Sequence, residues 1–284
     1  MTNVNELSKL ISLDIDSDTI SIGNEKFECC SLRKTSDLSQ WLYCVLHAGN
    51  PNLLQEKKQG SLEEKIRGSV DKRKCILYGD VVNIRGVSCV NIGGVRVHSE
   101  NGTTVDISKC RPNLTPGFFL YMNSVSEGKM LLNTDRYYIY ADDSSKAIQI
   151  WASLIEKLEN ISIPFTTKVL SQKSSYPRTD AIVVYSTREF SDEIRKVIVE
   201  VSDSRYPNDF EQRTSPLCFP ITNVVSFAQQ PNYKGKNVSF GESRCEAIAY
   251  AIKDSLVTGL DFKMLLKKRF ENTGINPNKI FEEL

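Results

Sequence analysis

Apolar residues near the start of the chain recur at intervals of three and four positions, which predicts a helix with one buried face. This stripe consists of Leu38, Trp41, Leu42, Val45 and Leu46. Gly49, Asn50 and Pro51 follow directly, and such a run ends a helix. A shorter helix and a short β segment are expected before it.

From residue 75 to 125 the pattern changes to alternation of apolar and polar residues, which predicts antiparallel strands. Asn101-Gly102 lies between two alternating segments, 95–99 and 103–107, and this dipeptide favours a two-residue hairpin turn. Gly93-Gly94 is also interpreted as a turn, because no phosphate-loop spacing surrounds it. We therefore predict that the segments 95–99 and 103–107 pair with each other.

The second half of the chain alternates between strands and amphipathic helices. We predict strands over 135–141, 165–169 and 181–185, and helices over 144–158, 191–201, 244–256 and 261–272. These elements indicate an α+β fold, with mixed or antiparallel sheets flanked by helices. We expect residues 1–125 to form a helical and antiparallel β part that recognises a peptide or serves as a scaffold. Residues 126–284 would form the α+β core.

Composition narrows the function classes. The chain has 284 residues and a net charge of +1, whereas nucleic-acid-binding proteins carry a strong basic excess. Its apolar runs are far shorter than the ~20 residues of a membrane-spanning helix. The first residues also lack a basic start followed by an apolar block, so we predict no secretory signal. We expect a cytoplasmic protein with neither a nucleic-acid nor a membrane partner.

Cysteine and histidine usage argues against a metal site. The eight cysteines form no C-x-x-C pair, and the chain has two histidines, so we expect free thiols and no metal. His47 closes the apolar helix, and His98 lies in the alternating region. We interpret both histidines as structural rather than catalytic.

Several cations are predicted to lie at strand or helix ends. Arg136 and Tyr138 are two residues apart on one strand, so their side chains share a face. Lys168 ends the next strand, and Arg178 precedes the one after it. Each residue alone is more typical of a salt bridge or a solvated strand end. Together the three cations could form an anion site.

A fourth cation belongs to the sequence that opens a late helix. Ser243 and Glu246 fit a capping box, which would place Arg244 in the first helical turn, a few residues after Ser239. A helix N-terminus offers unpaired N–H groups and a partial positive charge, and an arginine beside it favours phosphate. The alternative is that the Ser-x-x-Glu pattern is only a cap.

Four stretches of the second half resemble the HopA-type effector family of plant-pathogen secretion systems, whose relatives include lyases of lanthipeptide and thioamitide biosynthesis. They are Arg-Tyr-Tyr at 136–138, Ile-Pro-Phe-Thr-Thr-Lys at 163–168, Tyr-Pro-Arg-Thr-Asp-Ala at 176–181, and Ser-Phe-Gly-Glu-Ser-Arg-Cys-Glu-Ala-Ile-Ala at 239–249. The last stretch is the most specific. The first half of the chain resembles the family more loosely.

This resemblance implies a phosphothreonine-lyase-like catalytic half and a metal-independent carbon–oxygen lyase without a cofactor. Such an enzyme converts phosphoserine or phosphothreonine in a natural-product precursor peptide to dehydroalanine or dehydrobutyrine, by β-elimination of phosphate. A separate kinase-like phosphotransferase would be its partner. The implied catalytic residues are Lys168, Tyr138 and Asp180, and the implied phosphate ligands are Arg136, Arg178, Arg244 and Ser239.

Two questions stay open at this stage. More distant bacterial phosphothreonine lyases carry a Lys-x-His pattern where this chain has Arg136 and Tyr138, so the general acid would be a phenol. Lys168 and Asp180 both occupy positions suited to the general base. The alternative function is a non-catalytic effector, secreted rather than cytoplasmic, or a protein that binds phosphopeptides.

Overall fold

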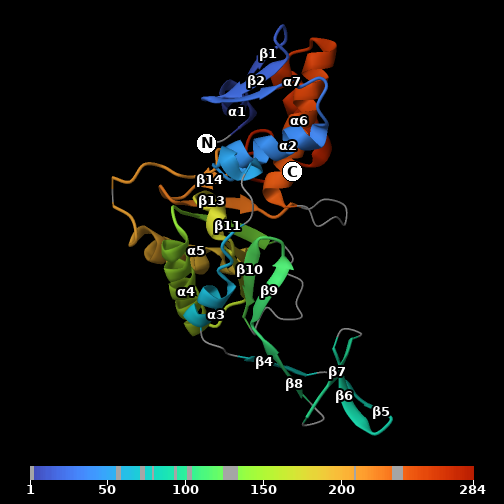
Figure 1. The fold of residues 1–284 in the computed structure, drawn as a ribbon, viewed down its shortest axis with the longest axis vertical. Helices are drawn as coiled ribbons and strands as arrows, with labels where there is room; N and C mark the ends of the chain where they lie inside the picture. Colours follow the sequence, from blue (N-terminus) through green and yellow to red (C-terminus); the bar gives the residue numbers. More distant parts are fainter. Residues whose placement is uncertain are drawn as a thin grey trace.

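The computed structural model spans the whole chain. It describes residues 3–55, 59–70, 74–78, 80–92, 95–100, 104–123, 134–207, 209–231 and 239–284. Figure 1 shows three parts along the long axis: a helical part with a small sheet at the top, a large sheet with helices in the middle, and a β arm at the lower end.

The α-helices are α1 (Val4–Leu10), α2 (Thr35–Leu42), α3 (Glu63–Ser69), α4 (Ser144–Asn160), α5 (Ser191–Asp203), α6 (Phe240–Thr258) and α7 (Phe262–Thr273). A π-helical turn, η1 (Tyr43–His47), continues α2. Short 3₁₀ turns are η2 (Pro51–Leu54), η3 (Lys173–Ser175) and η4 (Arg188–Phe190). The apolar stripe predicted for residues 38–46 is confirmed, because Leu38, Trp41, Leu42 and Leu46 are buried.

Three groups of strands account for the described β structure. The small top sheet consists of β1 (Ser12–Asp14), β2 (Thr19–Ile22) and β3 (Glu25–Glu28). The arm consists of β4 (Lys74–Tyr78), β5 (Asp80–Ile84), β6 (Val87–Ile92), β7 (Val95–His98) and β8 (Thr104–Ser108). The large sheet consists of β9 (Cys110–Thr115), β10 (Phe118–Met122), β11 (Thr134–Ala141), β12 (Phe165–Leu170), β13 (Arg178–Thr187), β14 (Phe219–Pro220) and β15 (Val225–Gln229).

The large sheet is antiparallel, with the order β14-β15-β11-β13-β12-β10-β9. Alternate residues of β11 enter two different cores. Tyr137 and Ile139 pack with α4 and α5 around Trp151, whereas Tyr138 packs with α2 and α6 around Phe240. The strand is buried on both faces, as its aromatic sequence requires. The predicted α+β class is confirmed.

The hairpin predicted around Asn101-Gly102 is wrong. The strand β7 pairs with β6, and β8 pairs with β4, so the two segments do not pair with each other. The dipeptides Gly93-Gly94 and Asn101-Gly102 themselves lie outside the described residues. Instead, β7 pairs with the strand directly before it and β8 with the more distant β4, so the Asn-Gly signal did not decide the pairing.

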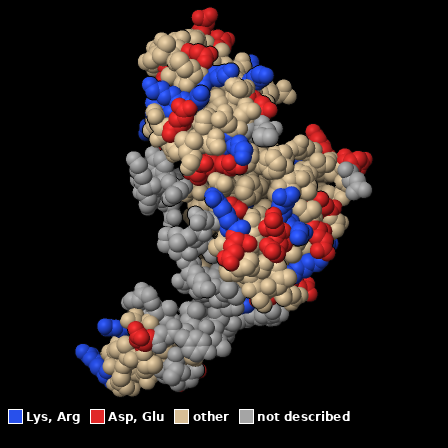
Figure 2. Space-filling model, turned by 180° about the vertical axis from the view of Figure 1, so that it is seen from behind, with Lys and Arg blue, Asp and Glu red and all other residues tan. Residues whose placement is uncertain are grey.

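The division of the chain at 125/126 stays a prediction. Contacts described in the structure cross it, because β10 pairs with β12 and the second core joins α2 to α6. No helix in the described part of the chain is both long and apolar enough to cross a membrane. Figure 2 shows acidic and basic side chains interspersed over the body of the molecule, as the net charge of +1 leads one to expect.

Candidate functional site

The register of three neighbouring strands places the predicted residues on one face of the large sheet. Tyr138 on β11 lies opposite Val183 on β13, which in turn lies opposite Lys168 on β12. In the next row, Arg136 lies opposite Tyr185. Strand spacing puts the Cα atoms of Tyr138 and Lys168 about 10 Å apart, with β13 between them.

Arg136 is a buried cation with neutral hydrogen-bond partners. Arg136 is only 7% exposed, and its Nε donates to Gln230 Oε1 at 2.5 Å. Nη1 donates to the Tyr138 hydroxyl at 3.5 Å, and the guanidinium lies 5.1 Å from the centre of the Tyr185 ring. None of its contacts with described residues is to a carboxylate. A buried charge without a counterion is costly, so this position favours an anion.

Lys168 and Arg178 continue the row of cations through shared aromatic rings. The Lys168 Nζ lies 4.2 Å from the centre of the Phe118 ring and 5.7 Å from that of Tyr185. The Arg178 guanidinium lies 5.7 Å from the same Phe118 ring. Lys168 is half-buried, and among the described residues it forms no ion pair. The rings therefore hold the three cations near one another without neutralising them.

Asp180 is bound to Arg178 in a bidentate pair. Nε and Nη2 of Arg178 donate to the two carboxylate oxygens, each at 2.7 Å. Burial alone would raise the pKa of Asp180, but the charge and hydrogen bonds of Arg178, together with the Tyr43 hydrogen bond, hold that pKa well below its ordinary value. Asp180 is therefore ionised and a weak proton acceptor. The geometry suits it to hold Arg178 in place.

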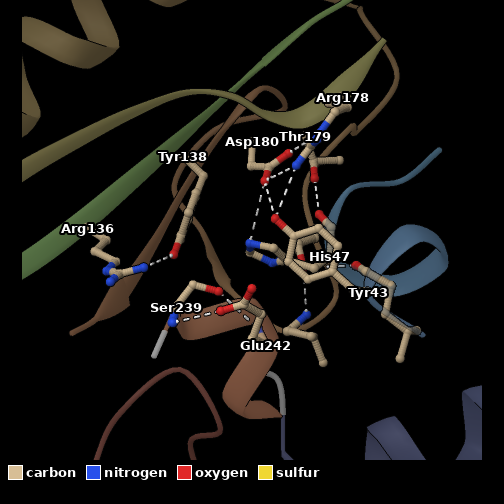
Figure 3. A network of polar contacts seen from close by, with 12 residues as sticks. Tyr43, His47, Arg136, Tyr138, Arg178, Thr179, Asp180, Ser239 and Glu242 are labelled. Atoms are coloured by element: carbon tan, nitrogen blue, oxygen red, sulfur yellow. Dashed lines mark hydrogen bonds and ion pairs between the residues drawn. The ribbon is translucent and has the colours of Figure 1, made fainter. Parts of the chain in front are cut away.

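Two residues of η1 complete this network. The Tyr43 hydroxyl donates to Asp180 Oδ2 at 2.9 Å and accepts from Arg178 Nη2 at 3.1 Å. His47 Nε2 lies 3.9 Å from the same carboxylate oxygen, and its ring meets the Tyr138 ring edge-on at 4.9 Å. Figure 3 shows His47 in the middle of these groups, between Tyr138 and Asp180.

The protonation of His47 follows from its surroundings. Burial lowers its pKa to about 4, although Asp180 opposes this, so the ring is neutral near pH 7. Ser215 donates its hydroxyl hydrogen to the Leu46 carbonyl at 2.9 Å, so at 3.3 Å it can only accept from His47 Nδ1. The neutral ring thus carries its hydrogen on Nδ1 and a lone pair on Nε2.

Ser239 is the N-cap of α6 rather than a free ligand. Its hydroxyl accepts from the Glu242 N–H at 3.2 Å, and the Glu242 carboxylate accepts from the Ser239 N–H at 3.1 Å. The capping box predicted at Ser243 and Glu246 is therefore wrong, and α6 begins at Phe240. In Figure 3 the start of α6 lies beneath Tyr138 and His47. Its partial positive charge adds to the attraction for an anion.

Arg244 is bound to the C-terminal segment, and its guanidinium lies 4.3 Å from the centre of the Phe240 ring. It is fully buried in the second turn of α6, and its Nε donates to the Ile280 carbonyl at 3.0 Å. Nη2 donates to the Glu282 carbonyl at 3.2 Å and to Glu283 Oε1 at 2.5 Å. These contacts fasten the C-terminal segment to α6. The structure thus brings Arg136, Tyr138, Lys168, Arg178 and Asp180 together, places Ser239 at their border, and engages Arg244 elsewhere.

The arrangement can hold a dianion. Arg136 and Arg178 outnumber the carboxylate of Asp180, which leaves a positive charge even when Lys168 serves as a neutral base, so the arrangement attracts a phosphomonoester of roughly −1.5 to −2. No group of three or more His, Cys, Asp or Glu side chains that could hold a metal ion exists in the described part of the chain. A cavity of about 350 Å³, lined by Tyr137, Phe227 and Phe281 among others, lies on the opposite face of β11, away from these cations.

Sequence reasoning missed Tyr43 and His47. Both lie more than 130 positions from Asp180, and the apolar spacing around them indicates only a helix face. The one feature of the sequence that could have pointed to His47 is that the chain has only two histidines. The interpretation of His47 as a buried helix end is confirmed, but the structure also places it within the network.

Comparison with known proteins gives the family. Two solved structures of effector proteins are similar in part, one from Pseudomonas syringae pv. tomato strain DC3000 and one from pv. syringae strain 61. The first is 21% identical with a TM-score of 0.43, and the match covers 58% of this chain and 62% of that one. The second is 18% identical with the same TM-score, and the match covers 59% and 63%.

This chain therefore spans less than two thirds of either effector structure. The comparison with curated proteins found no match. The model of the HopA1 effector protein family matches residues 110–281, which is more than half of the chain. This segment includes β11, β12, β13 and α6, and with them the three cations of the site. The protein belongs to the HopA1 effector protein family.

Proposed function

We propose that the protein is a phosphoserine/phosphothreonine lyase that eliminates phosphate from a peptide. The observation that carries this proposal is the buried guanidinium of Arg136, which has no carboxylate partner among the described residues and lies next to Lys168 across the Tyr185 ring. A phosphate group would supply the missing negative charge. Lys168, on β12 and separated from β11 by β13, would then face the α-carbon of the phosphorylated residue.

The cations would divide the work of holding and releasing phosphate. Arg136 and Arg178 offer forked donors, which bind phosphate oxygens in pairs. Asp180 and Tyr43 fix the orientation of Arg178, and Gln230 fixes that of Arg136. Donors that are already oriented lower the barrier when charge grows on the leaving group, because nothing has to reorganise.

The elimination itself needs one proton acceptor and one leaving-group partner. The uncharged amine of Lys168 removes the α-proton, and that C–H electron pair becomes the Cα=Cβ double bond. The Cβ–O bond breaks, and its electron pair leaves with phosphate toward Arg136 and Arg178. Burial raises the pKa of Tyr138, so its hydroxyl stays protonated and donates to a phosphate oxygen. The products are dehydroalanine or dehydrobutyrine and inorganic phosphate.

The substrate we propose is a phosphorylated natural-product precursor peptide. A separate kinase-like phosphotransferase would have to supply it, because the reaction consumes a phosphate ester that this site does not make. Within this proposal the protein acts in the bacterial cytoplasm. Secretion as an effector is the alternative, in keeping with the family.

Non-catalytic binding of a phosphopeptide is the second candidate. Tyr138 favours it, because a phenol whose pKa is raised by burial gives up its proton less readily than an imidazolium. Under this alternative the same cations hold the phosphate, and no bond breaks.

A phosphopeptide assay separates the two candidates. Purified protein is incubated with a phosphothreonine peptide, and mass spectrometry follows the loss of phosphoric acid. We expect elimination by the unchanged protein, and a loss of at least about 100-fold in rate for Lys168→Met, as is typical when a general base is removed. Lys157→Met is the matched control, because that lysine is exposed on α4 and pairs with Glu200. Binding without any mass change would support the non-catalytic alternative. If the peptide neither binds nor loses mass, the phosphate site is rejected.

A further inference from the structure

We infer that Tyr43 and His47 are positioning residues of the phosphate site: η1, which lies outside the family-matched segment 110–281, locks the Arg178–Asp180 pair in the orientation that presents Arg178 to phosphate. This inference rests on the proposed function. It adds that residues from the first part of the chain complete a site whose cations all come from the second part.

The Tyr43 hydroxyl is saturated by the pair that it bridges. Its single hydrogen is donated to Asp180 Oδ2, and it accepts a hydrogen from Arg178 Nη2. Asp180 already accepts two hydrogens from Arg178 at 2.7 Å. The phenol therefore closes a three-membered ring of hydrogen bonds, in which Arg178 cannot rotate without breaking a charge-assisted bond.

His47 packs against this ring without competing for it. As a neutral ring it leaves the Asp180 carboxylate to Arg178 and Tyr43, whereas an imidazolium 3.9 Å away would attract the carboxylate for itself. The charged or titratable groups around His47 are Asp180, Tyr43, Tyr138 and Arg178, with Arg136 and Lys168 farther off. His47 thus fills the space between β11, β13 and α6 and keeps the carboxylate where it is.

The backbone of η1 is fixed on both sides. The Thr179 N–H donates to the Ala48 carbonyl at 3.0 Å, and the Thr179 hydroxyl donates to the His47 carbonyl, so η1 is bound to the first residues of β13. On the other side, a Cβ on Gly241 would overlap the His47 ring and come within 2.7 Å of Tyr43 Cε2. Only glycine fits where α6 meets η1. The first turn of α6, η1 and the start of β13 therefore form one packed unit around the Arg178–Asp180 pair.

Phosphate affinity and a double-mutant cycle test this inference. Calorimetric titration with inorganic phosphate is carried out on the full chain and on Tyr43→Phe, Asp180→Asn and the double variant. We expect Tyr43→Phe to raise the phosphate Kd about tenfold, the effect of one charge-assisted hydrogen bond. The double variant should bind no worse than Asp180→Asn alone, because both changes release the same arginine. Turnover of the phosphopeptide should show both a raised KM and a lowered kcat, since Arg178 holds the phosphate and also receives the charge that grows on the leaving group.

Tyr206→Phe is the matched control. The Tyr206 hydroxyl is likewise buried and donates to the Tyr140 carbonyl at 3.0 Å, but it lies in the other core. We expect its phosphate Kd to equal that of the unchanged protein. If Tyr43→Phe does not fold, His47→Asn replaces it in the cycle, because it keeps a donor toward Ser215 and removes the ring beside Asp180.

The two possible failures are distinguishable. Failure of the unchanged protein to bind phosphate would reject the proposed function. Binding of phosphate by the unchanged protein together with an equal Kd in Tyr43→Phe or His47→Asn, or with fully additive effects in the cycle, would overturn the positioning role alone.

Discussion

Two arginines of the site differ in a way that stability measurements can expose. Arg178 has the carboxylate of Asp180, and Arg136 has an amide, a phenol and a ring. Removing one partner of a buried ion pair leaves the other uncompensated, whereas removing a buried charge that has no counterion relieves a cost. The two substitutions should therefore act in opposite directions on the free energy of unfolding.

We predict that Arg136→Met leaves the free energy of unfolding equal or higher in phosphate-free buffer, and that Arg178→Met lowers it by about 3–5 kcal/mol. Urea denaturation measures both. In excess phosphate the unchanged protein should gain stability by mass action, and Arg136→Met should not. A destabilisation by Arg136→Met as large as that by Arg178→Met would show that Arg136 already has a counterion in the folded protein.

His47 gives the molecule a pH dependence of stability. The pKa of His47 is about 4 in the folded protein, against an ordinary value of 6.5, so the unfolded chain binds the proton more readily. The contribution of His47 to the free energy of unfolding is fully present above pH 6.5. It is lost as the pH falls toward 4, by about 3 kcal/mol over the whole window. His47→Asn should lose this dependence when urea midpoints are compared across that range. His98→Asn, a change at an exposed histidine, should keep it, and an unchanged slope in His47→Asn would mean that the pKa of His47 is the same in the folded and the unfolded protein.

At the scale of single elements, local patterns predicted the strands β11, β12 and β13 and the helices α4 to α7, but they missed β14 and β15 and the exact ends of the helices. Two consecutive Ser-x-x-Glu patterns, one starting at Ser239 and one at Ser243, occur where α6 begins. The structure uses the first, because Phe240 and Gly241 are buried against η1 and so belong inside the helix. Burial against a distant segment decided between two caps that look alike locally.

The same limit applies to the pairing of strands and to the site. Alternation predicted antiparallel strands in residues 75–125, yet the partners of β7 and β8 depend on β4 and β6. The face shared by Arg136 and Tyr138 could be predicted, because side chains on a strand alternate. The bridge from Tyr43 to Asp180 spans 137 positions and leaves no periodic trace in the sequence.

At the scale of the whole molecule, Arg244 joins the last residues of the chain to the second core. Its guanidinium is surrounded by the Ile280 and Glu282 carbonyls, the Glu283 carboxylate and the Phe240 ring. The Gln229 N–H also donates to the Phe281 carbonyl, so the C-terminal segment lies along β15 as well as α6. An arginine in this position acts on the stability of the fold, and through α6 it supports the site only indirectly.

We predict that Arg244→Ala lowers the free energy of unfolding by about 3 kcal/mol, because it leaves a cavity and removes the buried partner of Glu283. Arg269→Ala is the matched control, since Arg269 pairs with Asp254 between α7 and α6 but is more than a third exposed, and its loss should cost less than about 1 kcal/mol. Phosphate titration of the folded fraction separates the roles. Arg244→Ala should bind phosphate like the unchanged protein wherever it is folded, and a weakened phosphate Kd in the folded variant would return Arg244 to the set of phosphate ligands.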